Sequence, residues 1–310
     1  MEKKEMRTVY AETLIDLARA DPDIVVLDAD LMKANGTAAF AKVYPDRAID
    51  CGVAEANMVG VASGLSAVGK IPFASTFACF ASRRAYDQFF LSANYARLNV
   101  KLVGTDPGVA AKYNGGTHMP FEDLALMRVV PGLTVVEPSD PTSLEKFVRL
   151  AAAHSGCVYL RMQRTPANVL YGAQEQFEFG KAKVLRSGGD AAILALGSVM
   201  VNEALAAAEL LATEGTRVTV VDMLSLKPLD LECVLRCARS TGRVLTCENA
   251  QIAGGLGSAA AEAILEAGVA AKFARIGIRD EFGEVGTVEY LMERYGLTAA
   301  HIAAAARSLL

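Results

Sequence analysis

A single carboxylate stands out at the start of an apolar stretch of small residues. Glu55 follows the turn Asp50-Cys-Gly-Val-Ala and precedes Ala-Asn-Met-Val-Gly-Val-Ala-Ser-Gly-Leu. A glutamate in the first turn of a helix complements the helix dipole, and this alone can explain its presence. A carboxyl group buried beside so much apolar sequence is also the kind of group that exchanges protons in active sites. Glu55 is therefore either a helix-start residue or a candidate acid–base residue.

Two further segments contain residue types that could act together with such a carboxyl. In Ser75-Thr-Phe77-Ala-Cys-Phe80-Ala-Ser-Arg83, the aromatic residues and the arginine recur every third position on an expected helix, so they share one face. His118 lies in Asn114-Gly-Gly-Thr-His118-Met-Pro, a loop whose glycines permit close approach of a ligand. Core packing is the ordinary explanation for isolated phenylalanines, and loop packing is an equal alternative for the histidine.

Common nucleotide and hydrolase motifs are absent or poorly placed. Gly255-Leu-Gly257-Ser-Ala-Ala fits G-x-G-x-x-A, but the expected strand before it ends at Cys247, which leaves an intervening loop. A dinucleotide site needs that turn directly after a strand, so we interpret these glycines as a tight helix start. The sequence has no G-x-x-x-x-G-K-[ST] loop and no G-x-S-x-G elbow.

Composition excludes several other classes. The 310 residues are 52% hydrophobic and 21% charged with a net charge of −4, which argues against a nucleic-acid or anionic-membrane surface. No apolar run reaches the ~18–20 residues of a membrane span, and the N-terminus does not resemble a signal peptide, so we expect a cytoplasmic protein. The six cysteines lie in apolar stretches without zinc-site spacing. We expect them to be reduced packing residues, and we expect no metal site.

Short apolar runs typical of strands alternate with helical segments along the chain. The expected strands are 24–27, 47–50, 71–75, 100–104, 133–137 and 157–160, and then 191–196, 217–222, 243–247 and 273–276. The expected helices are 7–20, 54–68, 79–96, 120–128 and 141–153, and then 199–213, 230–239, 256–267, 287–295 and 298–309. This alternation predicts an α/β protein with mostly parallel sheets. A polar break at 171–181 divides it into two doubly wound domains, 1–172 and 182–310.

Taken together, the motifs resemble one family. Their order is Glu55 after a Gly-Val turn, Ser-Thr-Phe77 with Phe80, Gly-Gly-Thr-His118, and Pro131-Gly-Leu-Thr-Val-Val-Glu-Pro-Ser-Asp140. Leu224-Ser-Leu-Lys-Pro and Glu248-Asn follow towards the tail. This order is similar to the C-terminal two-thirds of transketolases and of the related 1-deoxyxylulose-5-phosphate synthase. The resemblance covers almost the whole chain, and its specificity lies in the combination of motifs.

The resemblance implies a thiamine diphosphate cofactor and assigns roles around it. Glu55 corresponds to the glutamate that hydrogen-bonds N1′ of the aminopyrimidine and favours the imino tautomer that takes a proton from the thiazolium ring. Phe77 and Phe80 correspond to the aromatic pocket against that ring. Arg83, which lies where transketolases more often have tyrosine, and Asp30 are placed with the cofactor-binding residues.

Substrate positions also follow from the resemblance. His118 corresponds to the histidine that contacts donor-sugar hydroxyls, and Arg7 and Arg164 to arginines that hold a sugar phosphate. Asn114, at another substrate position, replaces an aspartate that reads a donor hydroxyl. Ala34 and Asp106 replace a serine and a histidine of the phosphate site, and an anion at position 106 would repel phosphate. We therefore expect an altered sugar or a different anionic group.

A Gly-Asp-Gly…Asn motif, which in this family holds Mg²⁺ on the diphosphate, is missing from the sequence. The resemblance thus implies a partner subunit that carries the diphosphate-binding domain and the Mg²⁺, in an α2β2 assembly. The predicted function is that of a split transketolase subunit that moves a two-carbon ketol unit between phosphorylated or other anionic sugars. The alternatives are a synthase that condenses pyruvate with an aldehyde, the beta subunit of a 2-oxoacid dehydrogenase, and a catalytically silent scaffold.

Overall fold

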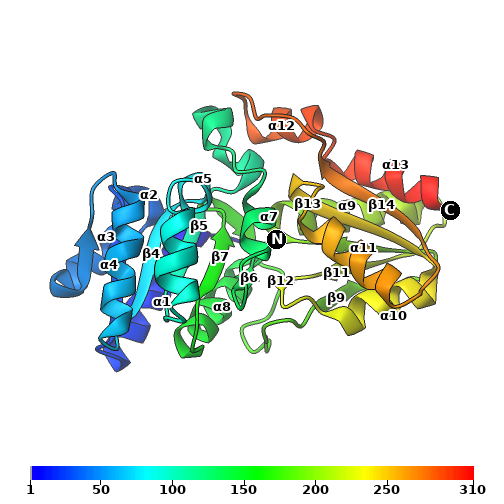
Figure 1. Cartoon of the computed structure of the whole chain (residues 1–310). Coiled ribbons are helices and arrows are strands. Elements are labelled where there is room, and N and C mark those ends of the chain that lie inside the picture. The colour runs from blue at the N-terminus through cyan, green and yellow to red at the C-terminus, as the bar shows by residue number, and fades with distance from the viewer. Residues whose placement is uncertain (1) are drawn as a thin grey trace.

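A computed structural model describes residues 2–310, and two sheets flanked by helices lie side by side in it (Figure 1). The first sheet has seven strands in the order β12-β6-β7-β5-β4-β2-β3, and only β12 runs antiparallel to its neighbour. In chain order the strands are β2 (Ile24–Asp28), β3 (Ala48–Asp50), β4 (Ile71–Phe77), β5 (Lys101–Thr105), β6 (Thr134–Val136), β7 (Val158–Met162) and β12 (Ser225–Lys227). Every residue of β2, β5 and β7 is buried, as expected for a parallel sheet covered on both faces.

The helices of this half range from three to 15 residues in length. They are α1 (Met6–Ala20), α2 (Met32–Asn35), α3 (Ala38–Val43), α4 (Glu55–Ala67), α5 (Ala78–Ser82), α6 (Tyr86–Gln88), α7 (Asp123–Arg128) and α8 (Pro141–Ala153). Three 3₁₀-helical segments, η1 (Pro45–Arg47), η3 (Gly108–Asn114) and η4 (Gly116–His118), and a π-helix, η2 (Phe89–Tyr95), also belong to this half. The sequence prediction of one helix over 79–96 was wrong, because α5 ends at Ser82 and the chain turns before α6.

The second sheet has five strands in the order β14-β13-β10-β11-β9, and only β9 is antiparallel. Its strands are β9 (Lys183–Arg186), β10 (Ala191–Ala195), β11 (Val218–Asp222), β13 (Arg243–Gln251) and β14 (Lys272–Ile278). Its helices are α9 (Gly197–Thr213), α10 (Leu231–Thr241), α11 (Leu256–Glu266), α12 (Val288–Arg294) and α13 (Ala299–Leu309). The predicted fold class, α/β with two mostly parallel sheets, is confirmed.

Each strand expected from the sequence overlaps an observed one, but some pairings were missed. A small antiparallel pair joins β1 (Lys3–Glu5) to β8 (Pro166–Asn168). Strand β12 crosses from the second half of the chain to hydrogen-bond with β6 of the first sheet. These strands are only three residues long, so their sequences do not show an apolar alternation that could have predicted them.

A buried network of charged side chains connects the first sheet to the second. Arg161, at the centre of β7, donates hydrogen bonds to Asp123 (2.7 and 3.1 Å), to Glu137 (2.8 Å) and to the carbonyl of Asn249 in β13 (2.9 Å). Each of its three nitrogens donates to an acceptor, as a fully buried guanidinium requires. The Asn249 side chain also accepts from the N–H of Val109 at 3.0 Å, which fixes the loop after β5.

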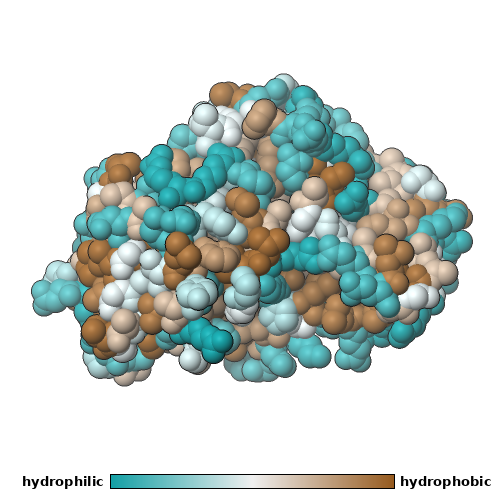
Figure 2. Space-filling view, viewed as in Figure 1, coloured by the Kyte–Doolittle hydropathy of each residue, from teal (hydrophilic) through white to brown (hydrophobic). Residues whose placement is uncertain are grey.

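The surface carries both hydrophobic and hydrophilic residues. Figure 2 shows hydrophobic residues on the viewed face in small groups among hydrophilic ones. Within residues 2–310, no helix combines the length and the apolar character needed to cross a membrane. All six cysteines are free thiols, and all but Cys51 are buried, so they act as packing residues.

Candidate active site

The predicted site residues follow the carboxyl ends of neighbouring parallel strands. Phe77 ends β4, Asp106 follows β5, Arg164 follows β7, and Glu55 begins the helix after β3. These ends meet along one edge of the sheet, which is where ligands bind in open α/β folds. The topology therefore gathers residues that are more than a hundred positions apart in the sequence.

Glu55 is the first residue of α4, and its side chain is only 1% exposed. One nitrogen of Arg84, Nη1, donates to both carboxylate oxygens of Glu55, at 3.0 and 2.8 Å. The side chain of Arg84 is 49% exposed, so the pair joins a buried carboxylate to a guanidinium that reaches solvent. Pairing is what a buried carboxylate needs to offset its desolvation.

An aromatic cluster lies beside this pair. The rings of Phe77 and Phe80 stack with centroids 6.0 Å apart. The His118 ring meets them edge-on, at 5.2 Å from Phe80 and 6.3 Å from Phe77. The guanidinium of Arg84 lies over the Phe80 ring at 4.5 Å. A carboxylate, aromatic faces and an imidazole are thereby combined in one place, and such a set can hold a flat, nitrogen-containing ring and exchange protons with it.

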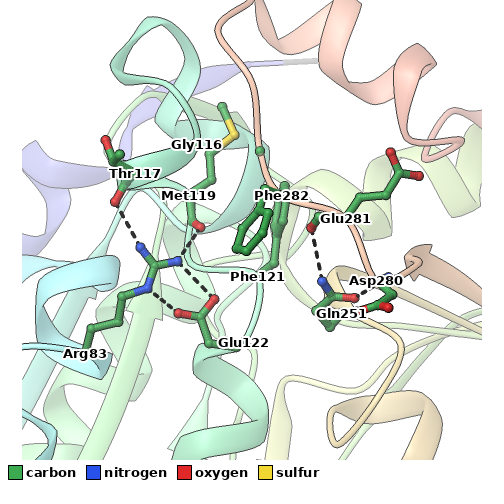
Figure 3. Close-up of a pocket in the computed structure, with 11 residues that line it drawn as sticks. Arg83, Gly116, Thr117, Met119, Phe121, Glu122, Gln251, Asp280, Glu281 and Phe282 are labelled. Carbon is green, nitrogen blue, oxygen red and sulfur yellow. Dashed lines mark hydrogen bonds and ion pairs between the residues drawn. The ribbon is translucent and has the colours of Figure 1, made fainter.

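Arg83 has a different environment from the one that its spacing suggested. It is the residue after the end of α5, and its guanidinium donates to the carbonyls of Thr117 (2.9 Å) and Met119 (3.0 Å) and to the Glu122 carboxylate (Figure 3). The hydrogen bond to Glu122 raises the pKa of Arg83. Arg83 thus ties down the loop that carries His118, whereas its neighbour Arg84 reaches the Phe80 ring and Glu55.

Sequence reasoning missed Arg84. The three-residue spacing from Phe77 and Phe80 pointed to Arg83, but α5 is a five-residue helix that ends before this position. The spacing of four residues between Phe80 and Arg84 is equally compatible with one helix face and could have identified it.

The loop that carries His118 is held tightly against the second half of the chain. Gly116 packs so closely on the Gly283 carbonyl that an added Cβ would overlap with it. Gly115 has a φ of 77°, a conformation that glycine adopts without strain. The hydroxyl of Thr117 is hydrogen-bonded to Nδ1 of His118 at 2.9 Å, so Nε2 is the ring nitrogen that can contact a ligand.

On the Phe77 side of the aromatic cluster, a backbone hydrogen bond joins two arginines. The N–H of Arg7 donates to the carbonyl of Arg164 at 3.2 Å. Arg164 forms an ion pair with Asp106, in which Nε lies 2.8 Å from Oδ2. Arg7 forms an ion pair with Glu5, and the two closest atoms are 2.7 Å apart. The guanidinium carbon of Arg164 lies 4.7 Å from the centroid of the Phe77 ring, which connects this end to the aromatic cluster.

The two remaining candidates lie outside this series of contacts. Asp30 is exposed, and its N–H donates to Asp50 at 2.9 Å. Asn114 is exposed at the end of η3. Asp28, by contrast, is buried and accepts hydrogen bonds from Leu31, Asn35 and Thr37, and burial raises its pKa to about 6.

A cavity of about 660 Å³ lies between the His118 loop and residues 280–283 of the second half (Figure 3). Its lining includes Arg83, Thr117, Phe121, Gln251 and Phe282, but not Glu55, Phe77 or Phe80. Phe282 is 96% exposed. The cavity therefore borders the loop and is separate from the aromatic cluster.

The G-x-G-x-x-A segment has a structural explanation. Strand β13 extends to Gln251, further than predicted, so the intervening loop is shorter than expected. The carboxylate of Glu248 accepts the N–H groups of Leu256 and Gly257, each at 2.8 Å, at the start of α11. Glu248 therefore occupies the position that a nucleotide phosphate would need, and the interpretation as a tight helix start agrees with this contact.

Comparison with known proteins agrees with this geometry. The family model for the transketolase pyrimidine-binding domain matches residues 2–168, and that for the transketolase C-terminal domain matches residues 180–302. The chain is 51% identical over 309 residues to a 6-deoxy-6-sulfo-D-fructose transketolase subunit of Clostridium sp. (strain MSTE9), a match that covers 100% of this chain and 95% of the relative. It is 42% identical to a putative transketolase C-terminal section of Methanocaldococcus jannaschii, with 97% and 94% covered.

The fold agrees equally well with a solved structure. A split-gene transketolase, solved as an inactive beta4 tetramer, superposes with a TM-score of 0.91 at 44% identity and covers 99% of this chain and 98% of that one. Sequence, fold and the arrangement of the strand ends point the same way. The chain belongs to the transketolase family, of which it carries the pyrimidine-binding and C-terminal domains.

Proposed function

We propose that this chain supplies the pyrimidine half-site of a split transketolase, which transfers a two-carbon ketol unit between anionic sugars. The single observation that supports the proposal is the buried carboxylate of Glu55, which Arg84 joins to the ring cluster of Phe80, Phe77 and His118 at the carboxyl edge of the first sheet. We assign residues 1–172 to the pyrimidine-binding domain and 182–310 to the C-terminal domain.

The residues present fit the aminopyrimidine end of thiamine diphosphate, the cofactor expected for this family. When bound, the cofactor supplies the electron sink for carbon–carbon cleavage. Glu55 holds a proton at the ring nitrogen, and the rings of Phe77 and Phe80 orient the pyrimidine. Arg84 uses a single nitrogen to bond both Glu55 oxygens, so each oxygen keeps a lone pair for a ligand.

Four further residues have roles in this proposal. His118 contacts the hydroxyls of the donor sugar through Nε2, and Asn114 serves the same sugar. Arg83, a proposed cofactor-binding residue, also positions the loop of His118 through its bonds to the carbonyls of Thr117 and Met119. Asp30, exposed after β2, remains a proposed cofactor contact of lesser importance.

The proposed donor carries an anionic group at its far end. Arg7 and Arg164, joined through their backbones, form the receptor for this group, because a planar guanidinium binds tetrahedral oxyanions through paired N–H donors. The Clostridium relative is a 6-deoxy-6-sulfo-D-fructose transketolase subunit. We propose the same class of donor here, a ketose with a terminal sulfonate.

The proposed active form includes a second polypeptide. The relatives that this chain covers almost completely are a transketolase subunit and a transketolase C-terminal section, and the solved split-gene neighbour is an inactive tetramer of beta chains. We propose an α2β2 complex in which the partner carries the diphosphate-binding domain and holds Mg²⁺.

Reconstitution tests the proposal. The purified chain is mixed with the candidate diphosphate-binding subunit, thiamine diphosphate and Mg²⁺, and supplied with 6-deoxy-6-sulfofructose and an aldehyde acceptor. The expected products are a sulfonated aldose shortened by two carbons and a ketose lengthened by two. In a parallel reaction supplied with pyruvate as the donor, consumption of pyruvate without ketol transfer would identify a synthase or dehydrogenase instead. Equal turnover by wild type and Glu55→Ala would identify a silent scaffold. Light scattering of the mixture checks the α2β2 stoichiometry.

A further inference from the structure

The receptor for the distal anion has no net positive charge. Arg164 forms an ion pair with Asp106, and Arg7 with Glu5, so two guanidinium groups face two carboxylates of the same chain. A site that holds a phosphate dianion usually presents uncompensated positive charge. Because each arginine is already paired with a carboxylate, the site attracts a highly charged anion less strongly.

The carboxylate of Asp106 cannot easily move away from its arginine. Asp106 follows β5 with a φ of 52°, and its N–H donates to the carbonyl of Met162 at 3.0 Å. Its side chain accepts both the backbone N–H of Arg164, at 3.1 Å, and the guanidinium Nε, at 2.8 Å. The residue is only 5% exposed. Its charge is therefore fixed and poorly screened by solvent.

The pair of Arg7 and Glu5 is neither held as firmly as that of Asp106 nor as well shielded from solvent. The side chains of Arg7 and Glu5 are each 38% exposed, so solvent and salt screen their charges. Glu5 also lies in the short edge strand β1. Of the two acids, Asp106 therefore has the stronger electrostatic effect on a bound anion.

We propose that Asp106 determines the donor specificity of this site, selecting a terminal monoanion such as a sulfonate over a phosphate dianion. This inference rests on the proposed function, in which Arg7 and Arg164 receive the distal group. Sulfonate and phosphate share a tetrahedral shape with three outer oxygens, but above pH ~6 phosphate carries a second charge. At a separation of about 6 Å, repulsion between a carboxylate and one extra negative charge weakens binding by about 10–100-fold at the effective dielectric of a partly buried site.

The test compares 6-deoxy-6-sulfofructose with fructose 6-phosphate as donors in the reconstituted complex. Glycolaldehyde is the acceptor, because an uncharged acceptor does not itself occupy the anion receptor. Wild type is expected to favour the sulfonate in kcat/KM. Asp106→Asn keeps the size of the side chain and suits a positive φ. It is expected to reduce that preference about 10–100-fold, mainly through a lower KM for the phosphate donor.

Two variants make the outcome specific. Glu5→Gln, which neutralises the exposed pair, is expected to change the preference less than roughly threefold. Asp106→Ser supplies a second neutral side chain and replaces the asparagine variant if that one does not fold. A preference that is unchanged in both Asp106 variants, or a wild type that favours the phosphate, overturns the inference while leaving ketol transfer intact. A wild type that uses neither donor overturns the proposed function itself.

Discussion

The contact between Glu55 and Arg84 leads to a quantitative prediction about stability. Replacing Arg84 with methionine leaves the buried carboxylate without its partner. Loss of one member of a fully buried pair costs about 3–5 kcal/mol, and loss of an exposed pair about 0–1 kcal/mol. Arg84 is 49% exposed and Glu55 1%, so we place the cost between these limits, at about 2 kcal/mol. In a Glu55→Gln background no charge is stranded, and the same replacement should cost about 0.5 kcal/mol, the stacking on Phe80.

Urea unfolding of the four proteins in this cycle, followed by circular dichroism, measures the coupling between the two sites. We predict a coupling free energy of about 1.5 kcal/mol. The matched control is Arg83→Met, because Arg83 pairs with Glu122 and not with Glu55. Arg83→Met should lower the free energy of unfolding by the same amount in the wild-type and in the Glu55→Gln background. Additive costs for Arg84 and Glu55 would refute the reasoning, as would a coupling that appears equally with Arg83.

Three other predictions follow from the buried groups and the tight loop. Burial raises the pKa of Asp222 to about 7, so the stability that its protonated form contributes is complete below pH ~4 and is lost as the pH rises through 7. The free energy of unfolding of Asp222→Asn should therefore rise relative to that of wild type by up to roughly 4 kcal/mol between pH 4 and pH 8. Urea unfolding across that pH range measures this difference. Arg161→Met strands its buried carboxylates and should lower the free energy of unfolding by about 3–5 kcal/mol, which the same assay detects. Gly116→Ala adds a Cβ that overlaps the Gly283 carbonyl and should displace the loop of His118, lowering ketol transfer in the reconstituted complex while circular dichroism shows a folded chain.

The sequence was sufficient to predict the main architecture. Strands such as β2 and β10 are short, wholly buried and mainly apolar runs between helices, and this pattern depends only on local residue types. The pairing of β12 with β6 could not be predicted in this way. It depends on a crossing from the second half of the chain to the first, which no local pattern records.

The candidate site was predictable in outline but not in its detailed contacts. Motif order pointed to Glu55, Phe80 and His118, and the structure places these side chains in one cluster. The expectation that Arg83 shares a helix face with Phe77 and Phe80 depended on an unbroken helix over 79–96, whereas the chain turns after Ser82. The ion pair that links Asp106 to Arg164 also could not be foreseen, because it depends on the alignment of β5 beside β7.

The most direct test of the account concerns the carboxyl of Glu55. Wild type and Glu55→Gln are compared in the complete complex with the diphosphate-binding subunit, thiamine diphosphate and Mg²⁺, and both cofactor binding and ketol transfer are measured. If Glu55 holds the proton at the pyrimidine ring, the variant still binds the cofactor but its kcat falls by about 10²–10⁴-fold. A Glu55→Gln complex that binds the cofactor and turns over at the wild-type rate would contradict this.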